Sequence, residues 1–178
     1  MRPEPGRRRA WLEAIQPAVL GAAGVLCFAP VELFWLAPLV LAGLFRLLGR
    51  SATPRQAFFT GWLFGSGFLL AGVSWIYVSL SVFGGMPWWL AGPATALLCL
   101  ALALLPGASA WLFKRWQPAA AWQQALYFAV LLALTDWVRG WIFTGFPWLA
   151  WGYSQTPPSP LAGFAPLVGV YGLSLLVA

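Results

Sequence analysis

The stretch WWLAGPATALLCLALALLPGASAWLF, residues Trp88–Phe113, decides the fold of this chain because it contains no charged side chain. A helix needs about 20 consecutive apolar residues to cross the hydrocarbon core of a bilayer. The run is long enough and therefore predicts a membrane-spanning helix. We expect Pro93 and Pro106 to bend it, because proline interrupts helical hydrogen bonding.

The rest of the chain has the same apolar character. Of its 178 residues, 61% are hydrophobic and only 8% are charged, and the mean hydropathy is +0.80. Soluble domains carry about a quarter charged residues. The composition therefore predicts an all-α integral membrane protein that forms one transmembrane domain over residues 1–178.

Apolar runs separated by turns and charged residues predict a polytopic bundle of about six transmembrane helices. A basic tail at residues 1–10 precedes them, and an aromatic segment at residues 139–163 lies between the last two. The predicted spans are residues 11–29, 33–48, 57–80, 88–113, 119–138 and 164–178. The last provides roughly 22 Å of helix, which is short of a crossing. Because a terminal carboxylate inside the bilayer is costly, we expect this helix to be truncated and the parent chain to continue.

The basic residues predict the orientation. Nine of the ten fall in the amino-terminal tail and in the second and fourth connections, and only Arg139 falls on the opposite side. The nine are Arg2, Arg7, Arg8, Arg9, Arg46, Arg50, Arg55, Lys114 and Arg115. Because loops rich in Lys and Arg stay in the cytoplasm, we expect a cytoplasmic amino terminus and an outer location for the turn near Phe83 and for the aromatic segment. The net charge of +6 is interpreted as a topology signal, so no nucleic-acid partner is expected.

Small residues recur at every fourth position at Ala57, Gly61 and Gly65. Small side chains at this spacing let two membrane helices approach closely. We therefore expect a helix-packing role for these three residues.

The sequence offers little catalytic chemistry. It has no histidine, four acidic residues and no phosphate-binding GxxxxGK loop. Cys27 and Cys99 both lie in apolar runs, where a thiol is inert. We therefore expect no catalytic residue, no metal site and no cofactor in these 178 residues.

The most unusual segment is DWVRGWIFTGFPWLAWGYSQ, residues Asp136–Gln155. It is too rich in Gly and Pro for a continuous helix and too aromatic for a solvent loop. Irregular backbone at membrane depth persists only against protein or a wet cavity. We therefore expect Phe146 and Trp148, which lie in the irregular part, to line a site at the outer surface.

Asp136 and Arg139 are three residues apart, so they share one face of a helix. One interpretation is an ion pair that caps the outer end of the fifth span. The other is that Asp136 holds Arg139 toward a lipid phosphate or a substrate carboxylate. The sequence supports both interpretations equally.

Two motifs together resemble one known family. FGSGFLLAGVSWIYVSLSVFGGMP (Phe64–Pro87) and DWVRGWIFTGFPWLAWGYSQ (Asp136–Gln155) resemble the membrane part of bacterial apolipoprotein N-acyltransferases. The resemblance extends from about Trp11 to the end of the chain. The order of the two motifs, and their predicted location on the same side of the membrane, also agree with that family.

This resemblance implies a multi-pass enzyme of the bacterial inner membrane. Such an enzyme transfers an acyl chain from a phospholipid donor to the amino-terminal diacylglyceryl-cysteine of a lipoprotein acceptor. The family's reaction takes place on a periplasmic nitrilase-like domain with a Glu-Lys-Cys triad. These residues contain no such domain, so we expect the fragment alone to be inactive.

What the resemblance carries over is an outer platform for lipid or substrate. Its candidate residues are Trp75, Tyr77, Phe83, Arg139, Phe146, Trp148, Tyr153 and Gln155. Two other interpretations remain, a small polytopic transporter or channel and a non-catalytic membrane scaffold. A transporter needs polar groups near the midplane of the bilayer, and the third and fourth predicted spans carry no charge.

Overall fold

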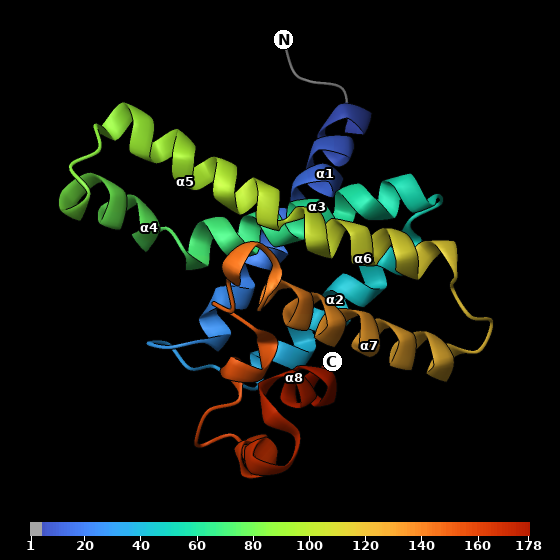
Figure 1. Cartoon of the computed structure of the whole chain (residues 1–178). Helices are drawn as coiled ribbons and strands as arrows, with labels where there is room; N and C mark the ends of the chain where they lie inside the picture. Colours follow the sequence, from blue (N-terminus) through green and yellow to red (C-terminus); the bar gives the residue numbers. More distant parts are fainter. Residues whose placement is uncertain (1–4) are drawn as a thin grey trace.

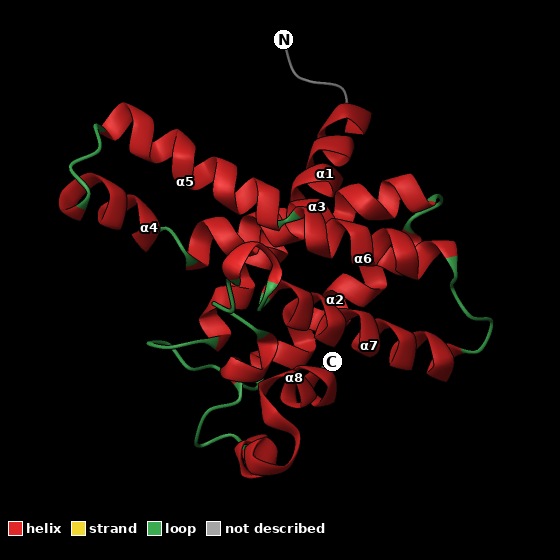
Figure 2. Cartoon of the chain, in the orientation of Figure 1, coloured by secondary structure: helices red, strands yellow, loops and turns green. Residues whose placement is uncertain are grey.

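A computed structural model describes the backbone of residues 5–178 and the side chains of residues 15–178 apart from Phe143. Within this part the chain is helical and has no β-strand, which confirms the all-α prediction (Figure 2). The α-helices are α1 (Pro5–Gly24), α2 (Leu36–Arg50), α3 (Pro54–Gly72), α4 (Trp75–Val78), α5 (Trp88–Leu102), α6 (Leu104–Arg115), α7 (Ala121–Arg139) and α8 (Ala165–Val177). The basic tail predicted at residues 1–10 lies outside the described side chains.

Short helical segments link these helices. They are η1 (Val25–Cys27), the π-helix η2 (Ser79–Phe83), η3 (Ile142–Thr144), η4 (Trp151–Ser154) and η5 (Pro160–Phe164). The last three lie in the predicted aromatic segment, residues 139–163. That segment is irregular because Gly and Pro interrupt it and because its backbone turns sharply after α7.

Two helical stretches in the described residues are long and apolar enough to cross a membrane. One is Trp88–Arg115, which joins α5 and α6, and the other is Pro160–Val177. A third is formed if α3 and the helical turn after it are counted as one bent span. The bundle of about six spans therefore remains a prediction.

The stretch predicted as one span at residues 57–80 is broken near its carboxyl-terminal end. α3 stops at Gly72, and the axis turns by 50° before the helix resumes at Trp75. Val73 has the non-helical angles φ −120° and ψ 19°. The side chain of Leu149 occupies the space where a Cβ of residue 72 would lie. A glycine at the end of α3 thus lets the aromatic segment pack into the break.

The long apolar run is interrupted at Ala103, between α5 and α6. Pro106 accounts for the interruption because it has no N–H to donate to a carbonyl one turn earlier. Pro93 lies inside α5 without ending it. Of the two prolines expected to bend this run, only Pro106 therefore lies beside a break in the helix, and the bend itself remains a prediction.

Helix α3 lies at the centre of the molecule and packs against α1 on one side and α6 on the other (Figure 1). Ala57 is fully buried, and a Cβ at Gly61 would lie 2.5 Å from both the Ala110 Cβ and the Pro106 carbonyl oxygen. The small-residue stripe therefore has the packing role predicted for it.

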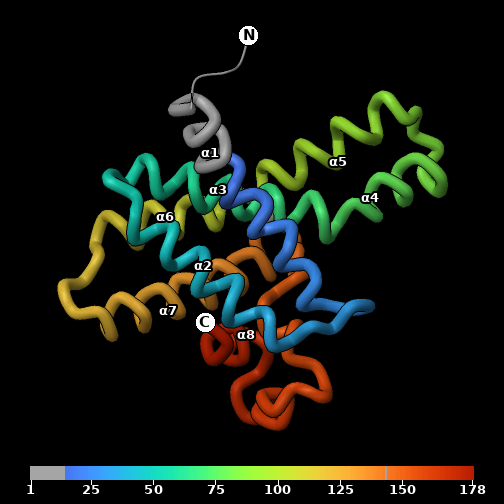
Figure 3. The backbone as a smooth tube through the Cα atoms, turned by 180° about the vertical axis from the view of Figure 1, so that it is seen from behind, coloured from blue at the N-terminus to red at the C-terminus, as the bar shows by residue number. Residues whose placement is uncertain are grey.

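The basic connections lie together at one end of the molecule. Front and back views place the α2–α3 and α6–α7 connections on the same side, opposite the turn between η2 and α5 (Figures 1 and 3). Lys114, at the end of α6, donates to the Gly49 carbonyl near the end of α2 at 3.5 Å. The two basic connections therefore share one end of the molecule, and the orientation in the membrane remains a prediction.

Candidate functional site

The aromatic segment starts from a buried ion pair in the last turn of α7. Nη2 of Arg139 donates to Oδ1 of Asp136 at 2.9 Å. The two residues are only 5% and 3% exposed. Among the described residues, Nε of Arg139 has no hydrogen-bond partner. The structure thus contains the Asp136–Arg139 ion pair that one interpretation of the sequence placed at the end of this helix. The pair holds the Arg139 guanidinium inside the protein.

The second carboxylate oxygen of Asp136 connects three separate elements. Oδ2 accepts a hydrogen bond from the Trp151 amide at 2.7 Å and another from the Ser174 hydroxyl at 2.8 Å. The Ser174 oxygen in turn accepts from the Gly152 amide at 2.8 Å. The first two amides of η4 are therefore held by side chains of α7 and α8.

A second hydrogen bond fixes the other end of the segment. The Phe146 amide donates to the Arg139 carbonyl at 2.7 Å. Residues 145–153, which we call the rim, thus leave the last turn of α7 and return to it. The rim is a closed arch with both ends attached to one helical turn.

The backbone of this arch is strained. Thr144, Gly145 and Leu149 have positive φ angles of 78°, 87° and 60°. Only glycine adopts such angles easily, and a β-branched threonine there is a true outlier. Strain of about 1–3 kcal/mol per residue persists only where surrounding contacts enforce it. Such outliers gather at binding and catalytic sites, which marks the rim as the candidate site.

The rim side chains divide into a packed set and an exposed set. Phe146 and Leu149 pack against a buried cluster formed by Leu69, Val73, Cys99 and Ala103. Trp148 points outward and is half exposed. Its ring lies 5.5 Å from that of Phe146 and 5.7 Å from that of Trp75 on α4. The structure therefore brings together three of the eight candidate residues.

A groove of about 380 Å³ runs along the exposed side of the rim. Tyr153, a fourth candidate, lines it beside Trp148. The other lining residues are Phe28, Ala29, Pro147 and Leu149. The surface is apolar and aromatic and includes one phenol hydroxyl, a composition typical of the boundary between hydrocarbon and water.

Two further candidates lie away from this cluster. Tyr77 on α4 and Phe83 on η2 belong to the arm that α4, η2 and α5 extend from the bundle (Figure 1). Phe83 is 84% exposed at the turn. The structure places both on an exposed surface and does not join them to the rim.

The remaining candidate, Gln155, is buried just after the rim. Its Nε2 donates to the Ser154 hydroxyl at 2.9 Å, and its Oε1 accepts from the Ser159 hydroxyl at 2.7 Å. Nε2 also lies 3.4 Å from the Phe34 carbonyl oxygen before α2. These contacts attach the end of the rim to the turn before α2, so Gln155 and Arg139 both support the rim from within.

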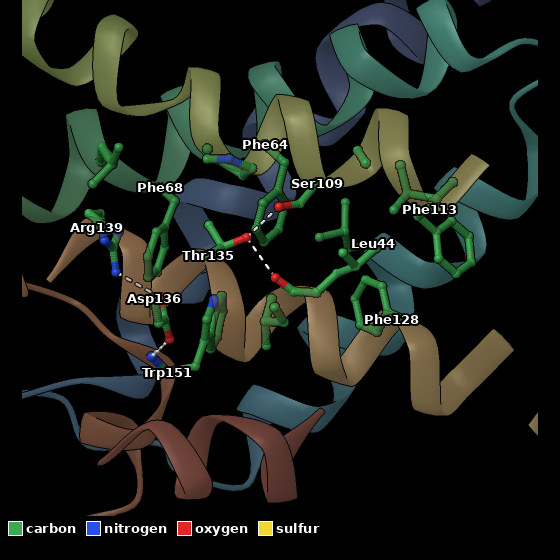
Figure 4. A pocket seen from close by; sticks show the side chains of 17 residues that line it. Leu44, Phe64, Phe68, Ser109, Phe113, Phe128, Thr135, Asp136, Arg139 and Trp151 are labelled. Atoms are coloured by element: carbon green, nitrogen blue, oxygen red, sulfur yellow. Dashed lines mark hydrogen bonds and ion pairs between the residues drawn. The ribbon is translucent and has the colours of Figure 1, made fainter. Parts of the chain in front are cut away.

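An internal cavity lies behind the ion pair, between α2, α3, α6 and α7 (Figure 4). Apolar side chains, aromatic and aliphatic, line most of it, with Asp136 and Arg139 at one end and the Ser109–Thr135 hydrogen bond along its wall. Its volume is about 50 Å³. An engineered cavity that binds benzene has a volume of about 150 Å³, so this smaller space does not hold a lipid chain. The groove outside the rim is the better candidate.

Sequence reasoning missed Ser174 and Trp151 as parts of the site. Trp151 stacks on Phe68 of α3 at 4.9 Å with an interplanar angle of 7°. Trp151 is only 3% exposed, so it belongs to the core and not to the surface of the segment. No sequence signal separates it from Trp148, because both lie in the same irregular run.

Comparison with known proteins decides the family. The model of the apolipoprotein N-acyltransferase N-terminal domain matches residues 20–178. The chain belongs to this family. The match includes both motifs on which the resemblance rested and every residue of the rim.

Named relatives agree with the family match. The chain is 49% identical over 169 residues to the apolipoprotein N-acyltransferase of Nitrosomonas europaea, covering 94% of this chain and 34% of the relative. It is 47% identical to that of Chromobacterium violaceum and 43% identical to that of Ralstonia nicotianae, covering 90% of this chain and 31% of the relative in both cases. The chain thus spans about a third of the length of the curated relatives it matches.

Proposed function

We propose that this chain is the membrane portion of an apolipoprotein N-acyltransferase and that its rim holds a phospholipid at the outer surface of the bacterial inner membrane. The full enzyme transfers an acyl chain from that phospholipid to the amino-terminal diacylglyceryl-cysteine of a lipoprotein. The family match supports the reaction, and the anchored rim with its adjoining groove supports the lipid-holding role.

The rim has the physical features that a lipid-holding surface needs. Its aromatic rings offer large apolar area with little rotamer entropy to lose on contact. Its two anchors fix Trp148 beside Trp75 before any lipid arrives, so little ordering remains to oppose binding. Trp75, Phe146, Trp148 and Tyr153 form the contact surface in this proposal, whereas Arg139 and Gln155 support it from behind.

The described residues do not provide the acyl-transfer chemistry. Cys27 and Cys99 are 1% and 0% exposed in the apolar core. A buried thiol cannot reach an ester at the membrane surface. The proposal therefore places the nucleophile in a domain outside these 178 residues and makes the fragment alone inactive.

A chimera tests this function. The aligned amino-terminal third of the N. europaea relative is replaced by this chain, and the product is expressed in cells depleted of their own enzyme. We expect lipoproteins to regain the N-linked acyl chain, measured by mass spectrometry of their amino-terminal peptides. This chain expressed alone should leave them diacylated. A chimera that accumulates in the membrane and restores no acylation would contradict the proposal.

A further inference from the structure

We propose that Asp136 is a positioning residue that sets the conformation of the rim, and that Arg139 acts through Asp136 and not by binding a lipid phosphate. The inference rests on the proposed lipid-holding function and identifies the contacts that hold Trp148 in its exposed position. Asp136 itself does not contact lipid, because it is 3% exposed and lies behind the rim.

The contacts of Asp136 connect the elements that the rim must join. Its two oxygens accept hydrogen bonds from Arg139 on α7, from the Trp151 amide on η4 and from Ser174 on α8. An ionised carboxylate is the side chain that accepts on both oxygens and donates on neither. Each of these three partners presents a donor, so the position favours Asp over Asn.

The strain in the rim explains why such a clamp is needed. Thr144 and Leu149 hold positive φ angles on either side of Trp148, and isolated L-residues avoid that region. Without the bond from Trp151 to Asp136, the rim would keep the Phe146–Arg139 backbone bond near its start and the Gly152–Ser174 bond near its end. The Ser174 hydroxyl that accepts the second bond is itself oriented by Asp136. The strained turn at Leu149 would then relax, and the Trp148 ring would leave its place beside Trp75.

Arg139 has a different part in this arrangement. A buried carboxylate without a compensating charge is strongly destabilised, and Arg139 provides that charge at 2.9 Å. Since the arginine is 5% exposed, its guanidinium is not presented to a lipid headgroup. Removing either partner leaves the other as a buried charge without a counter-charge. The effects of substituting the two side chains should therefore not be additive.

The test uses the whole chain in nanodiscs of phosphatidylethanolamine and phosphatidylglycerol. Hydrogen exchange of peptides from the rim and from α5 reports the conformation. Crosslinking by a phosphatidylethanolamine with a diazirine on one acyl chain reports lipid contact at the same peptides. The variants are Asp136→Asn, Arg139→Gln and the double change, with Glu32→Gln in an exposed outer turn as the matched control.

In Asp136→Asn we expect exchange at the Trp151 and Gly152 amides to accelerate about tenfold or more, because both bonds depend on the carboxylate or on the Ser174 hydroxyl it orients. Rim crosslinking should fall severalfold while α5 exchange and crosslinking stay unchanged. Arg139→Gln should have a similar effect. The double variant should recover part of the lost rim crosslinking, because it contains no buried charge without a counter-charge.

Two results would overturn the positioning role. One is rim exchange in Asp136→Asn that matches Glu32→Gln. The other is a double variant that crosslinks no better than Arg139→Gln, which would assign Arg139 to the lipid itself. The proposed function fails separately if the unaltered chain crosslinks no more at the rim than along α5. In that case the exchange data alone still decide whether Asp136 fixes the rim.

Discussion

At the scale of single residues, the rim contains two tryptophans that differ in burial. Trp148 is half exposed beside the groove, whereas Trp151, three residues later, is buried against Phe68 and Phe28. The difference comes from the positive φ at Leu149, which turns the chain between them. A strained backbone residue thus decides which ring is exposed at the groove and which anchors the segment.

Replacing Trp148 by alanine should reduce lipid contact without unfolding the protein. The side chain packs mainly on Phe146 and Trp75 at the surface, so its loss should cost about 1 kcal/mol of stability or less. Rim crosslinking to a diazirine phospholipid should fall severalfold. Thermal unfolding in detergent and crosslink mass spectrometry on the same sample measure the two effects.

Trp62→Ala is the matched control for that experiment. Trp62 lies on α3 and donates from its indole nitrogen to the Leu100 carbonyl of α5 at 3.1 Å. Its removal should lower stability by about 3 kcal/mol, since both packing and a hydrogen bond are lost. Rim crosslinking should persist in the folded fraction. Equal loss of crosslinking in both variants would mean that Trp148 serves helix packing only.

Gly152→Ala should destabilise the attachment of the rim to α8. A Cβ at residue 152 would clash with the Val170 carbonyl, which is backbone and cannot move aside as a side chain can. We expect a loss of about 2 kcal/mol in the free energy of unfolding, measured by chemical denaturation. Gly163→Ala on η5 is the control, because nothing lies within 4 Å of its Cβ position. If Gly152→Ala left the free energy of unfolding unchanged, α8 and η4 would be packed less closely than in the structure.

At the scale of elements, replacing glycine by alanine should have opposite effects on stability in two neighbouring helices, α3 and α5. Gly61 in α3 faces α6 at close range, whereas a Cβ at Gly92 in α5 meets nothing within 4 Å. Alanine favours a helix interior over glycine by about 1 kcal/mol. Gly92→Ala should therefore raise the unfolding temperature in detergent. Gly61→Ala should lower it, by separating α3 from α6, and a stabilising effect there would rule out their close packing.

The apolar runs and the positions of Gly and Pro were sufficient to predict the helical class and the irregular aromatic segment. The break at Val73 was missed, because residues 57–80 contain no charge and no proline and the cause of the break is tertiary. Leu149 packs at Gly72 from a distant part of the chain, and no local pattern records that contact. Asp136 and Arg139 were recognised as a pair, but Ser174 was not, since its only signal is a hydroxyl in an apolar helix.

At the scale of the whole molecule, the two ends of the bundle differ in chemistry. Basic residues gather at the α2–α3 and α6–α7 connections, whereas the turn before α5 has none (Figure 1). Exposed aromatic rings lie at both ends, Phe83 and Trp88 at that turn and Trp116 and Trp122 at the α6–α7 connection. The α5–α6 stretch of 28 residues joins the two ends. Since about 20 apolar residues span the hydrocarbon core, this stretch is long enough to expose each end to a different face of the membrane.

This separation predicts the sidedness of the protein. The nine basic residues assigned to one side should hold it in the cytoplasm, because moving a cluster of charges across the bilayer is opposed by its hydration and by the membrane potential. A cysteine placed at Phe83 should then react with a membrane-impermeant maleimide in intact spheroplasts. A cysteine placed at Trp116, just after α6, should react only after lysis. The native Cys27 and Cys99 are buried, so the unaltered chain measures the background. Reversed labelling would invert the proposed orientation and place the rim in the cytoplasm, where a periplasmic catalytic domain could not reach a lipid held on it. Equal labelling at both positions before lysis would show that α5–α6 does not cross the membrane.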